Sequence, residues 1–390
     1  MAKLGDVCVS ITDGSHNPPV GVEQSPFIML SSKNIEDNYI SLSSPRYLSE
    51  SDYASENKRT QISAGDLLVT IVGTIGRVAI VPPALEGICV QRSVAVLKTN
   101  PDIIDNRFLM YQLQNMRPHL EREAKGVAQK GIYLKQLSSL TVSTPPMEEQ
   151  KRIAAVLDKV TDLIAQRHAQ LDKLDLLVKS RFVEMFGDPV LNPMRWSLVE
   201  LSYCLSKIDN GKSLVCDAKS RQGNWPAILK LSAVTYGDYQ PEENKAMLHA
   251  DEFVDNAEVR SGDLLFTRKN TPELVGMCAY VYETPVKLMM PDLIFRLNTN
   301  EKCNSIFLWK LINHDLFREN IKAISSGSAK SMSNISKERL RELKIILPPI
   351  ELQQQFAHFV KKTDQSKLTI NKSLDKLEMA KNAIMQQYFG

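Results

Sequence analysis

Residues 145–187 read PPMEEQKRIAAVLDKVTDLIAQRHAQLDKLDLLVKSRFVEMFG, and their residue pattern is that of one long helix. Two prolines at its start block a helix upstream, whereas residues 147–186 contain neither proline nor glycine. Apolar side chains recur at alternating intervals of three and four residues, with one interruption at Arg167. This heptad pattern predicts a coiled-coil helix, roughly 60 Å long at about 1.5 Å per residue. The residues of the seam are Ile153, Leu157, Val160, Ile164, Leu171, Leu174 and Val178.

The same stretch returns in the second half of the chain, where Pro348-Pro349-Ile350-Glu351 repeats Pro145-Pro146-Met147-Glu148. Thr363 and Lys367 replace two apolar seam residues, and polar residues near mid-seam cost stability but can fix register and orientation. One such helix alone would be explained by packing on its own domain. Two at corresponding places favour pairing with each other, and antiparallel pairing would put the domains at opposite ends. The second seam comprises Phe356, Val360, Ile370, Leu374, Leu377 and Ile384.

The segments ahead of the two helices also repeat, since Gly65-Asp66-Leu67-Leu68 returns as Gly262-Asp263-Leu264-Leu265. Short β-branched runs separated by turn residues predict strands in both copies, and each set is followed by a helix. We therefore expect an α+β fold in which two homologous domains are separated by two long antiparallel coiled-coil helices, with pseudo-two-fold symmetry. The predicted strands are 66–72, 78–81 and 93–97, then 264–267, 279–282 and 293–297; the predicted helices are 106–113 and one around 307–309.

The composition is that of an ordinary globular protein large enough for two cores. A net charge of +3 permits nucleic-acid binding but does not by itself indicate it. Six scattered cysteines form no CxxC pair, so neither a disulfide framework nor a metal site is expected. The first residues, Met1 to Asp6, do not form the apolar core of a signal peptide, so none is expected, and no run of about 18 apolar residues occurs. A cytoplasmic protein without membrane contact is expected.

Several short motifs follow one another along the first half and return, more loosely, in the second. They are Leu4-Gly5-Asp6, Ile11-Thr12-Asp13-Gly14-Ser15-His16, Gly65-Asp66-Leu67-Leu68, Gly73-Thr74-Ile75-Gly76-Arg77, Gly131-Ile132-Tyr133-Leu134, Pro145-Pro146-Met147-Glu148-Glu149-Gln150 and Phe186-Gly187-Asp188-Pro189. This set resembles the specificity subunit of type I restriction-modification systems over essentially the whole chain. The second copy departs from the first, because Met277 stands at the place of Arg77.

The resemblance implies target-recognition domain 1 at 1–145, a central spacer helix at 146–190, target-recognition domain 2 at 191–346 and a C-terminal spacer helix at 347–390. Such subunits bind a split double-stranded DNA target with an unread spacer, and they are not catalytic alone. The resemblance also implies two modification (methyltransferase) subunits that use S-adenosylmethionine, and restriction subunits that use ATP and Mg. No cofactor is expected in this chain.

The residues themselves reveal no catalytic centre. Asn17-Pro18-Pro19-Val20 resembles the motif of adenine methyltransferases, but its fourth residue is not aromatic and cannot stack on a flipped base. Gly211-Lys212-Ser213 resembles the end of a phosphate-binding loop, but Ser206 stands where that loop needs glycine. Two alternatives stay open: a duplicated protein-interaction scaffold, which the low net charge favours, and, ranked lower, a self-contained DNA methyltransferase.

Loops that combine glycine with amide, hydroxyl and charged side chains are the candidate DNA contacts. In the first half these are Asp13, Gly14, Ser15, His16, Asn17, Gly73, Thr74, Gly76, Arg77, Gln91, Arg92, Lys125, Gln129 and Lys130. In the second half they are Lys212, Ser213, Thr267, Arg268, Lys269, Asn270, Ser328, Lys330 and Ser331. An ordinary solvated loop is an equal alternative for any one of them. Because these loops repeat less faithfully than the helices, we expect two different half-sites, an asymmetric target, and half-sites roughly one helical turn (near 34 Å) apart.

Overall fold

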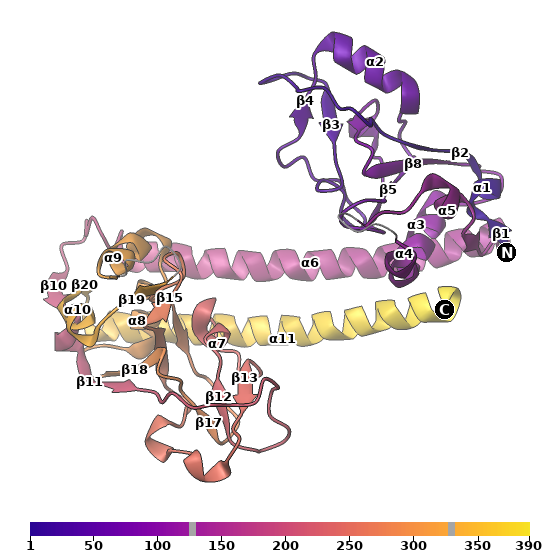
Figure 1. The fold of residues 1–390 in the computed structure, drawn as a ribbon. Helices are drawn as coiled ribbons and strands as arrows, with labels where there is room; N and C mark the ends of the chain where they lie inside the picture. Colours follow the sequence, from indigo (N-terminus) through magenta and orange to yellow (C-terminus); the bar gives the residue numbers. More distant parts are fainter. Residues whose placement is uncertain (125–129, 327–331) are drawn as a thin grey trace. The chain divides into compact units, whose positions relative to one another are not determined.

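The computed structural model describes residues 1–124, 130–326 and 332–390. The chain divides into two compact units: unit 1 comprises Met1–His168 and Asn371–Gly390, and unit 2 comprises Ala169–Ile370. Two long helices, α6 (Met147–Phe186) and α11 (Ile350–Phe389), each contribute one part to each unit (Figure 1). A unit is therefore one mixed domain together with a piece of both long helices.

Unit 1 has three sheets. The four-stranded sheet has the order β2-β8-β5-β6, the three-stranded sheet the order β4-β3-β7, and β1 pairs with β9. The strands are β1 (Ala2–Lys3), β2 (Cys8–Asp13), β3 (Ile28–Leu30), β4 (Arg46–Tyr47), β5 (Leu67–Thr70), β6 (Val78–Ile80), β7 (Cys89–Val90), β8 (Val94–Thr99) and β9 (Thr141–Val142). The helices are α1 (Leu4–Val7), α2 (Glu50–Thr60), the 3-10 helix η1 (Pro83–Leu85), α3 (Asn106–Asn115), α4 (Arg117–Glu123) and α5 (Leu134–Ser138).

Unit 2 repeats this topology with the orders β11-β18-β14-β16, β13-β12-β17 and β10-β20, and it adds the pair β15-β19. Its strands are β10 (Ser197–Glu200), β11 (Leu205–Asn210), β12 (Ala227–Leu229), β13 (Asn244–Ala246), β14 (Leu264–Thr267), β15 (Lys269–Asn270), β16 (Cys278–Tyr280), β17 (Leu288–Met289), β18 (Ile294–Thr299), β19 (Ser333–Asn334) and β20 (Lys344–Leu347). Its helices are η2 (Leu201–Cys204), α7 (Ser232–Thr235), η3 (Ala250–Glu252), η4 (Asp255–Ala257), α8 (Ser305–Ile312), η5 (Asp315–Phe317), α9 (Arg318–Ala323) and α10 (Lys337–Glu342). The α+β fold and all the predicted strands and helices are confirmed.

The inner strands β5 and β14 of the two four-stranded sheets are buried on both faces. In unit 1, Leu67 and Val69 belong to the core that includes α3 and the long helices, whereas Leu68 belongs to a second core beside the three-stranded sheet. Successive side chains of a strand point to opposite faces, so a strand between two layers must be apolar throughout. Unit 2 divides Leu264 and Leu265 between its two cores in the same way.

The long helices pack together in antiparallel fashion in both units. In unit 1, Arg152 near the start of α6 lies over the ring of Tyr388 near the end of α11. In unit 2, Phe186 at the end of α6 packs on Phe356 near the start of α11, with ring centroids 5.4 Å apart. The predicted pairing direction is confirmed.

The seam is buried most deeply where a domain covers it. Among the predicted seam residues, those fully buried are Ile153, Leu157, Val178, Phe356, Val360 and Leu374. Those that are half-buried are Val160, Ile164, Leu171, Leu174, Ile370, Leu377 and Ile384. A seam between two helices alone shields one side of each residue, which explains the intermediate values. The role of these residues in a subunit interface stays a prediction.

The polar residues of the seam are satisfied internally. The Thr363 hydroxyl donates to the carbonyl of Phe359 at 3.0 Å. Lys367 forms ion pairs with Asp175 of α6 and with Asp364. A charge at this position is therefore compensated across the helix pair of unit 2, in line with a function in fixing register.

A buried glutamine ties the start of each long helix to its domain. The Gln353 Oε1 accepts from the Asn304 N–H at 2.8 Å, and its Nε2 donates to the carbonyls of Pro348 and Lys302 at 2.7 and 3.3 Å. Gln150 repeats this arrangement with Asp105, Pro145 and Ile103. The glutamine three residues after the Pro-Pro-x motif thus connects each long helix to the N-cap of α3 in unit 1 or of α8 in unit 2.

We predict that Gln353→Ala lowers the free energy of unfolding by about 2–3 kcal/mol, because it leaves buried backbone groups without partners. Urea unfolding of the whole chain measures the change. Gln354→Ala is the matched control, since Gln354 is exposed on the same turn. Equal midpoints for the two variants would contradict the prediction.

Candidate nucleic-acid interface

A cavity of about 630 Å³ opens in unit 1 where the chain leaves β2 and enters β8. The end of β2 meets the segment before β8 through a parallel bridge between Ser15 and Gln91. Ser15 N donates to the Val90 carbonyl at 2.9 Å, and Arg92 N donates to the Ser15 carbonyl at 2.8 Å. The lining residues include Ser31, Ser32, Lys33, Asn34, Arg46, Tyr47, Gln91, Arg92 and Ser93.

Gly14 makes this junction possible. A Cβ on Gly14 would lie 1.9 Å from the Val90 carbonyl oxygen, and one on Gly211 would lie 2.1 Å from that of Pro291. Both distances are far below van der Waals contact, so only glycine fits at either place. The small residue thus allows two segments of the chain to approach each other. That glycine at this place lets the backbone approach DNA stays a prediction.

A second cavity, of about 490 Å³, occupies the equivalent place in unit 2. Lys212 bridges to Pro291, its N–H donates to Met290, and the N–H of Asp292 donates to the Lys212 carbonyl at 3.0 Å. The strand registers also correspond, because Arg46 pairs with Met29 in unit 1 as Lys245 pairs with Ile228 in unit 2. The lining residues include Lys212, Ser213, Lys230, Ser232, Lys245, Pro291 and Asp292.

Both cavities carry cations without acidic partners among the described residues. These are Lys33, Arg46 and Arg92 in unit 1, and Lys212 and Lys245 in unit 2, and Arg46 donates to the backbone carbonyls of Pro18 and Pro19. Lys230 differs, since its Nζ lies 3.6 Å from Glu243. A hydrogen bond from Ser232 and the charge of Lys230 lower the pKa of the Glu243 carboxyl below its ordinary value. Unpaired cations around an open cavity are suited to contact with phosphates.

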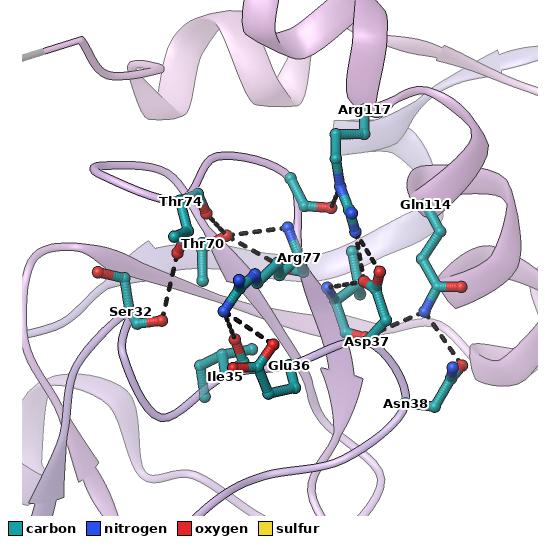
Figure 2. A network of polar contacts seen from close by, with 12 residues as sticks. Ser32, Ile35, Glu36, Asp37, Asn38, Thr70, Thr74, Arg77, Gln114 and Arg117 are labelled. Atoms are coloured by element: carbon teal, nitrogen blue, oxygen red, sulfur yellow. Dashed lines mark hydrogen bonds and ion pairs between the residues drawn. The ribbon is translucent and has the colours of Figure 1, made fainter. Parts of the chain in front are cut away.

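A polar network fixes one wall of the unit 1 cavity (Figure 2). Arg77 pairs with Glu36 at 2.8 Å, and Arg117 pairs with Asp37 while its Nε donates to the Gly76 carbonyl at 3.2 Å. The Thr74 hydroxyl donates to the Ser32 carbonyl at 3.3 Å. The segment that supplies Ser31 to Asn34 is therefore held from the β5–β6 turn and from α4. Arg77 positions this wall, and its own contact with DNA stays a prediction.

The corresponding arginine is missing from unit 2. Met277 N donates to the Thr267 hydroxyl at 2.9 Å, as Arg77 N does to that of Thr70, so the two residues are equivalent. Arg318 donates to the carbonyls of Gly276 and Val275 at 3.0 and 2.6 Å. The two units thus share an arginine that donates to this glycine carbonyl, Arg117 or Arg318, and differ at Arg77 and Met277.

The remaining predicted contacts divide by accessibility. Asp13 is buried and accepts from His16 and Arg59, whereas His16 and Asn17 are exposed. The exposed Gly73 and Thr74 line a further cavity of about 460 Å³ with Arg77, Arg117, Glu121 and Lys130, and Gly76 is buried beside it.

In unit 2, Thr267 and Asn270 are buried, and Asn270 donates to the Thr235 hydroxyl at 3.1 Å. Arg268 lies over the Phe295 ring at 5.0 Å, and Lys269 is half-buried. These residues are not part of the unit 2 cavity. The predicted contacts Lys125, Gln129, Ser328, Lys330 and Ser331 lie outside the described residues.

Sequence reasoning missed several cavity residues, namely Ser31, Ser32, Lys33, Asn34, Arg46, Lys230, Ser232, Lys245 and Asp292. Insertions shift the spacing between the two copies from 197 residues at the Gly14 and Gly211 pair to 199 at the Arg46 and Lys245 pair. A single offset therefore does not align the cavity cations of the two copies, and only the strand pairing shows which of them are equivalent.

Within the described ranges, no group of three or more His, Cys, Asp or Glu residues is placed to hold a metal ion. The same part of the chain contains no helix that is long and apolar enough to span a membrane.

The chain thus has two units of one topology, two long helices and two cavities at equivalent places. This architecture defines the class of protein with duplicated recognition sites. The family model of the type I restriction modification DNA specificity domain matches residues 24–175 and 204–379. The chain belongs to this family and is a DNA specificity subunit of a type I restriction-modification system. Such a subunit is not catalytic by itself and is part of a larger complex.

Individual relatives agree with this assignment. The type I restriction enzyme EcoEI specificity subunit of Escherichia coli is 25% identical over 302 residues, which cover 73% of this chain and 50% of that protein. The chain thus spans half the length of this relative. The MjaVIII specificity subunit of Methanocaldococcus jannaschii is 24% identical over 361 residues, covering 84% and 79%. The crystal structure of the S subunit from M. genitalium has the same fold, with a TM-score of 0.61, 14% identity, and coverage of 100% and 95%.

Proposed function

We propose that each unit binds one half-site of an asymmetric, bipartite duplex DNA target. The observation that carries this proposal is the pair of equivalent cavities, each with unpaired cations and each with a different lining. Shared backbone geometry would give both units the same approach to the duplex, whereas different side chains would select different bases.

The long helices are the proposed platform for the partner subunits. Leu176, Leu177 and Val183 of α6 are exposed apolar side chains in unit 2, and a partner helix would cover such residues. The partners are two modification (methyltransferase) subunits with S-adenosylmethionine, and restriction subunits that use ATP and Mg. The chain itself supplies recognition and holds no cofactor.

Methylation mapping tests this proposal directly. The chain is combined with its modification subunits and offered a library of duplexes with randomised positions, and the methylated products are sequenced. We expect two short conserved blocks that differ in sequence and are separated by an unread spacer. A perfect palindrome, or methylation without sequence preference, would contradict the proposal.

A salt series separates DNA recognition from the alternative of a protein-interaction scaffold, which the net charge of +3 favours. If the cavity cations bind phosphates, the logarithm of the association constant falls linearly with the logarithm of the salt concentration. A protein-interaction scaffold would show no such salt-dependent binding of duplex DNA. Methyl transfer by the isolated chain would instead support a self-contained methyltransferase.

A further inference from the structure

The same backbone position carries opposite charges in the two units. Arg92 and Asp292 each donate a backbone N–H to the strand end across the bridge, at 2.8 Å to Ser15 and at 3.0 Å to Lys212. Each residue also lines the cavity of its own unit. The two residues are therefore structural equivalents. A ligand of the unit 1 cavity meets the guanidinium of Arg92 at the place where a ligand of the unit 2 cavity meets the carboxylate of Asp292.

The Asp292 carboxylate has no partner within the described part of the chain, although three lysines line the same cavity. Of these, Lys230 pairs with Glu243, whereas Lys212 and Lys245 form no ion pair with a described residue. Asp292 is half-buried. A half-buried acceptor beside unpaired cations, yet not bonded to them, is available to a ligand.

Duplex DNA limits what such a carboxylate can bind. Phosphates repel it, so a carboxylate in a DNA-binding cavity weakens binding unless it accepts hydrogen bonds from bases. In the major groove the donors are the exocyclic amino groups of cytosine and adenine, and aspartate accepts characteristically from cytosine N4. Arginine at the equivalent place suits the O6 and N7 acceptors of guanine.

We propose that Asp292 is a specificity-determining residue that accepts a hydrogen bond from the N4 amino group of a cytosine in the half-site bound by unit 2. This inference rests on the proposed function and adds a base to it. Lys212 and Lys245 hold the flanking phosphates and offset the repulsion between the carboxylate and the DNA backbone. Arg92, at the equivalent place in unit 1, selects a different base at the corresponding position of the other half-site.

The test uses the complex with its modification subunits and the randomised duplex library. Wild type is compared with Asp292→Asn, Asp292→Ala and the control Asp251→Asn, because Asp251 is exposed in unit 2 and outside the cavity. In wild type we expect one position of one half-site to require cytosine. Both Asp292 variants should reduce that preference about 10- to 100-fold, while the other half-site and the control keep theirs. Asparagine should shift the preference toward adenine, which it contacts through N6 and N7.

Unchanged base preferences in both Asp292 variants would overturn the assignment, as would an equal loss at every position of both half-sites. A wild-type requirement for a base other than cytosine at the position that the Asp292 variants affect would also overturn it. These failures leave a bipartite target in place. Absence of any bipartite preference in wild type would instead be a failure of the proposed function itself.

Discussion

Replacing the three lysines of the unit 2 cavity by glutamine, in the variant Lys212→Gln/Lys230→Gln/Lys245→Gln, is expected to weaken DNA binding by the assembled complex on the order of 100-fold near physiological salt. Each lysine that contacts a phosphate releases condensed counterions. The slope of the logarithm of affinity against the logarithm of salt should therefore fall by about 1.8 through Lys212 and Lys245, since Lys230 pairs with Glu243. Titration of labelled duplex at several salt concentrations measures both quantities.

Three lysines elsewhere in unit 2 provide the matched control. Lys207, Lys302 and Lys344 are exposed and lie outside the cavity, where they contact Asp209, Tyr203 and Glu200 respectively. Their replacement by glutamine changes net charge equally but should leave the slope nearly unchanged. If both triple variants lose affinity to the same extent, the effect comes from total charge and the cavity is not the site of phosphate contact.

The two long helices were predictable because their signal is periodic. A heptad pattern free of proline and glycine indicates a helix wherever its partner lies, and α6, Met147–Phe186, spans the stretch without these two residue types inside the expected spacer helix at 146–190. Short buried strands such as β5 and β14 were equally visible, since all four residues of each are buried and apolar or β-branched. A strand that is buried on both faces has no alternation of apolar and polar residues, so it appears in the sequence as a short apolar run.

The cavities were only partly predictable because loop cations have no period. Gln91, Arg92, Lys212 and Ser213 were expected as contacts and line the cavities, whereas Lys245 was not expected. Its equivalence to Arg46 depends on strand pairing, which insertions conceal in the sequence. Arg77 is the opposite case. It was expected as a DNA contact because it follows a glycine-containing turn, but in the structure it pairs with Glu36.

Removing one aromatic ring should destabilise unit 2 more than any surface change. Phe356 of α11 is fully buried, and its ring centroid lies 5.5 Å from that of Phe182 and 5.4 Å from that of Phe186, both on α6. Phe307 of α8 completes the cluster at 5.0 Å from Phe186. Phe356→Ala should lower the free energy of unfolding by about 3–5 kcal/mol, because it removes apolar contacts and leaves a cavity. Urea unfolding followed by circular dichroism measures this change.

Leu368→Ala on the same helix is the control, since Leu368 is exposed and its truncation should cost less than about 0.5 kcal/mol. In unit 1 the place of Phe356 is taken by Ile153, which packs in a core with Phe108 and Met385. Ile153→Ala removes fewer atoms and should cost about 2–4 kcal/mol. A loss below about 1 kcal/mol for Phe356→Ala would mean that the cluster closes around the missing ring.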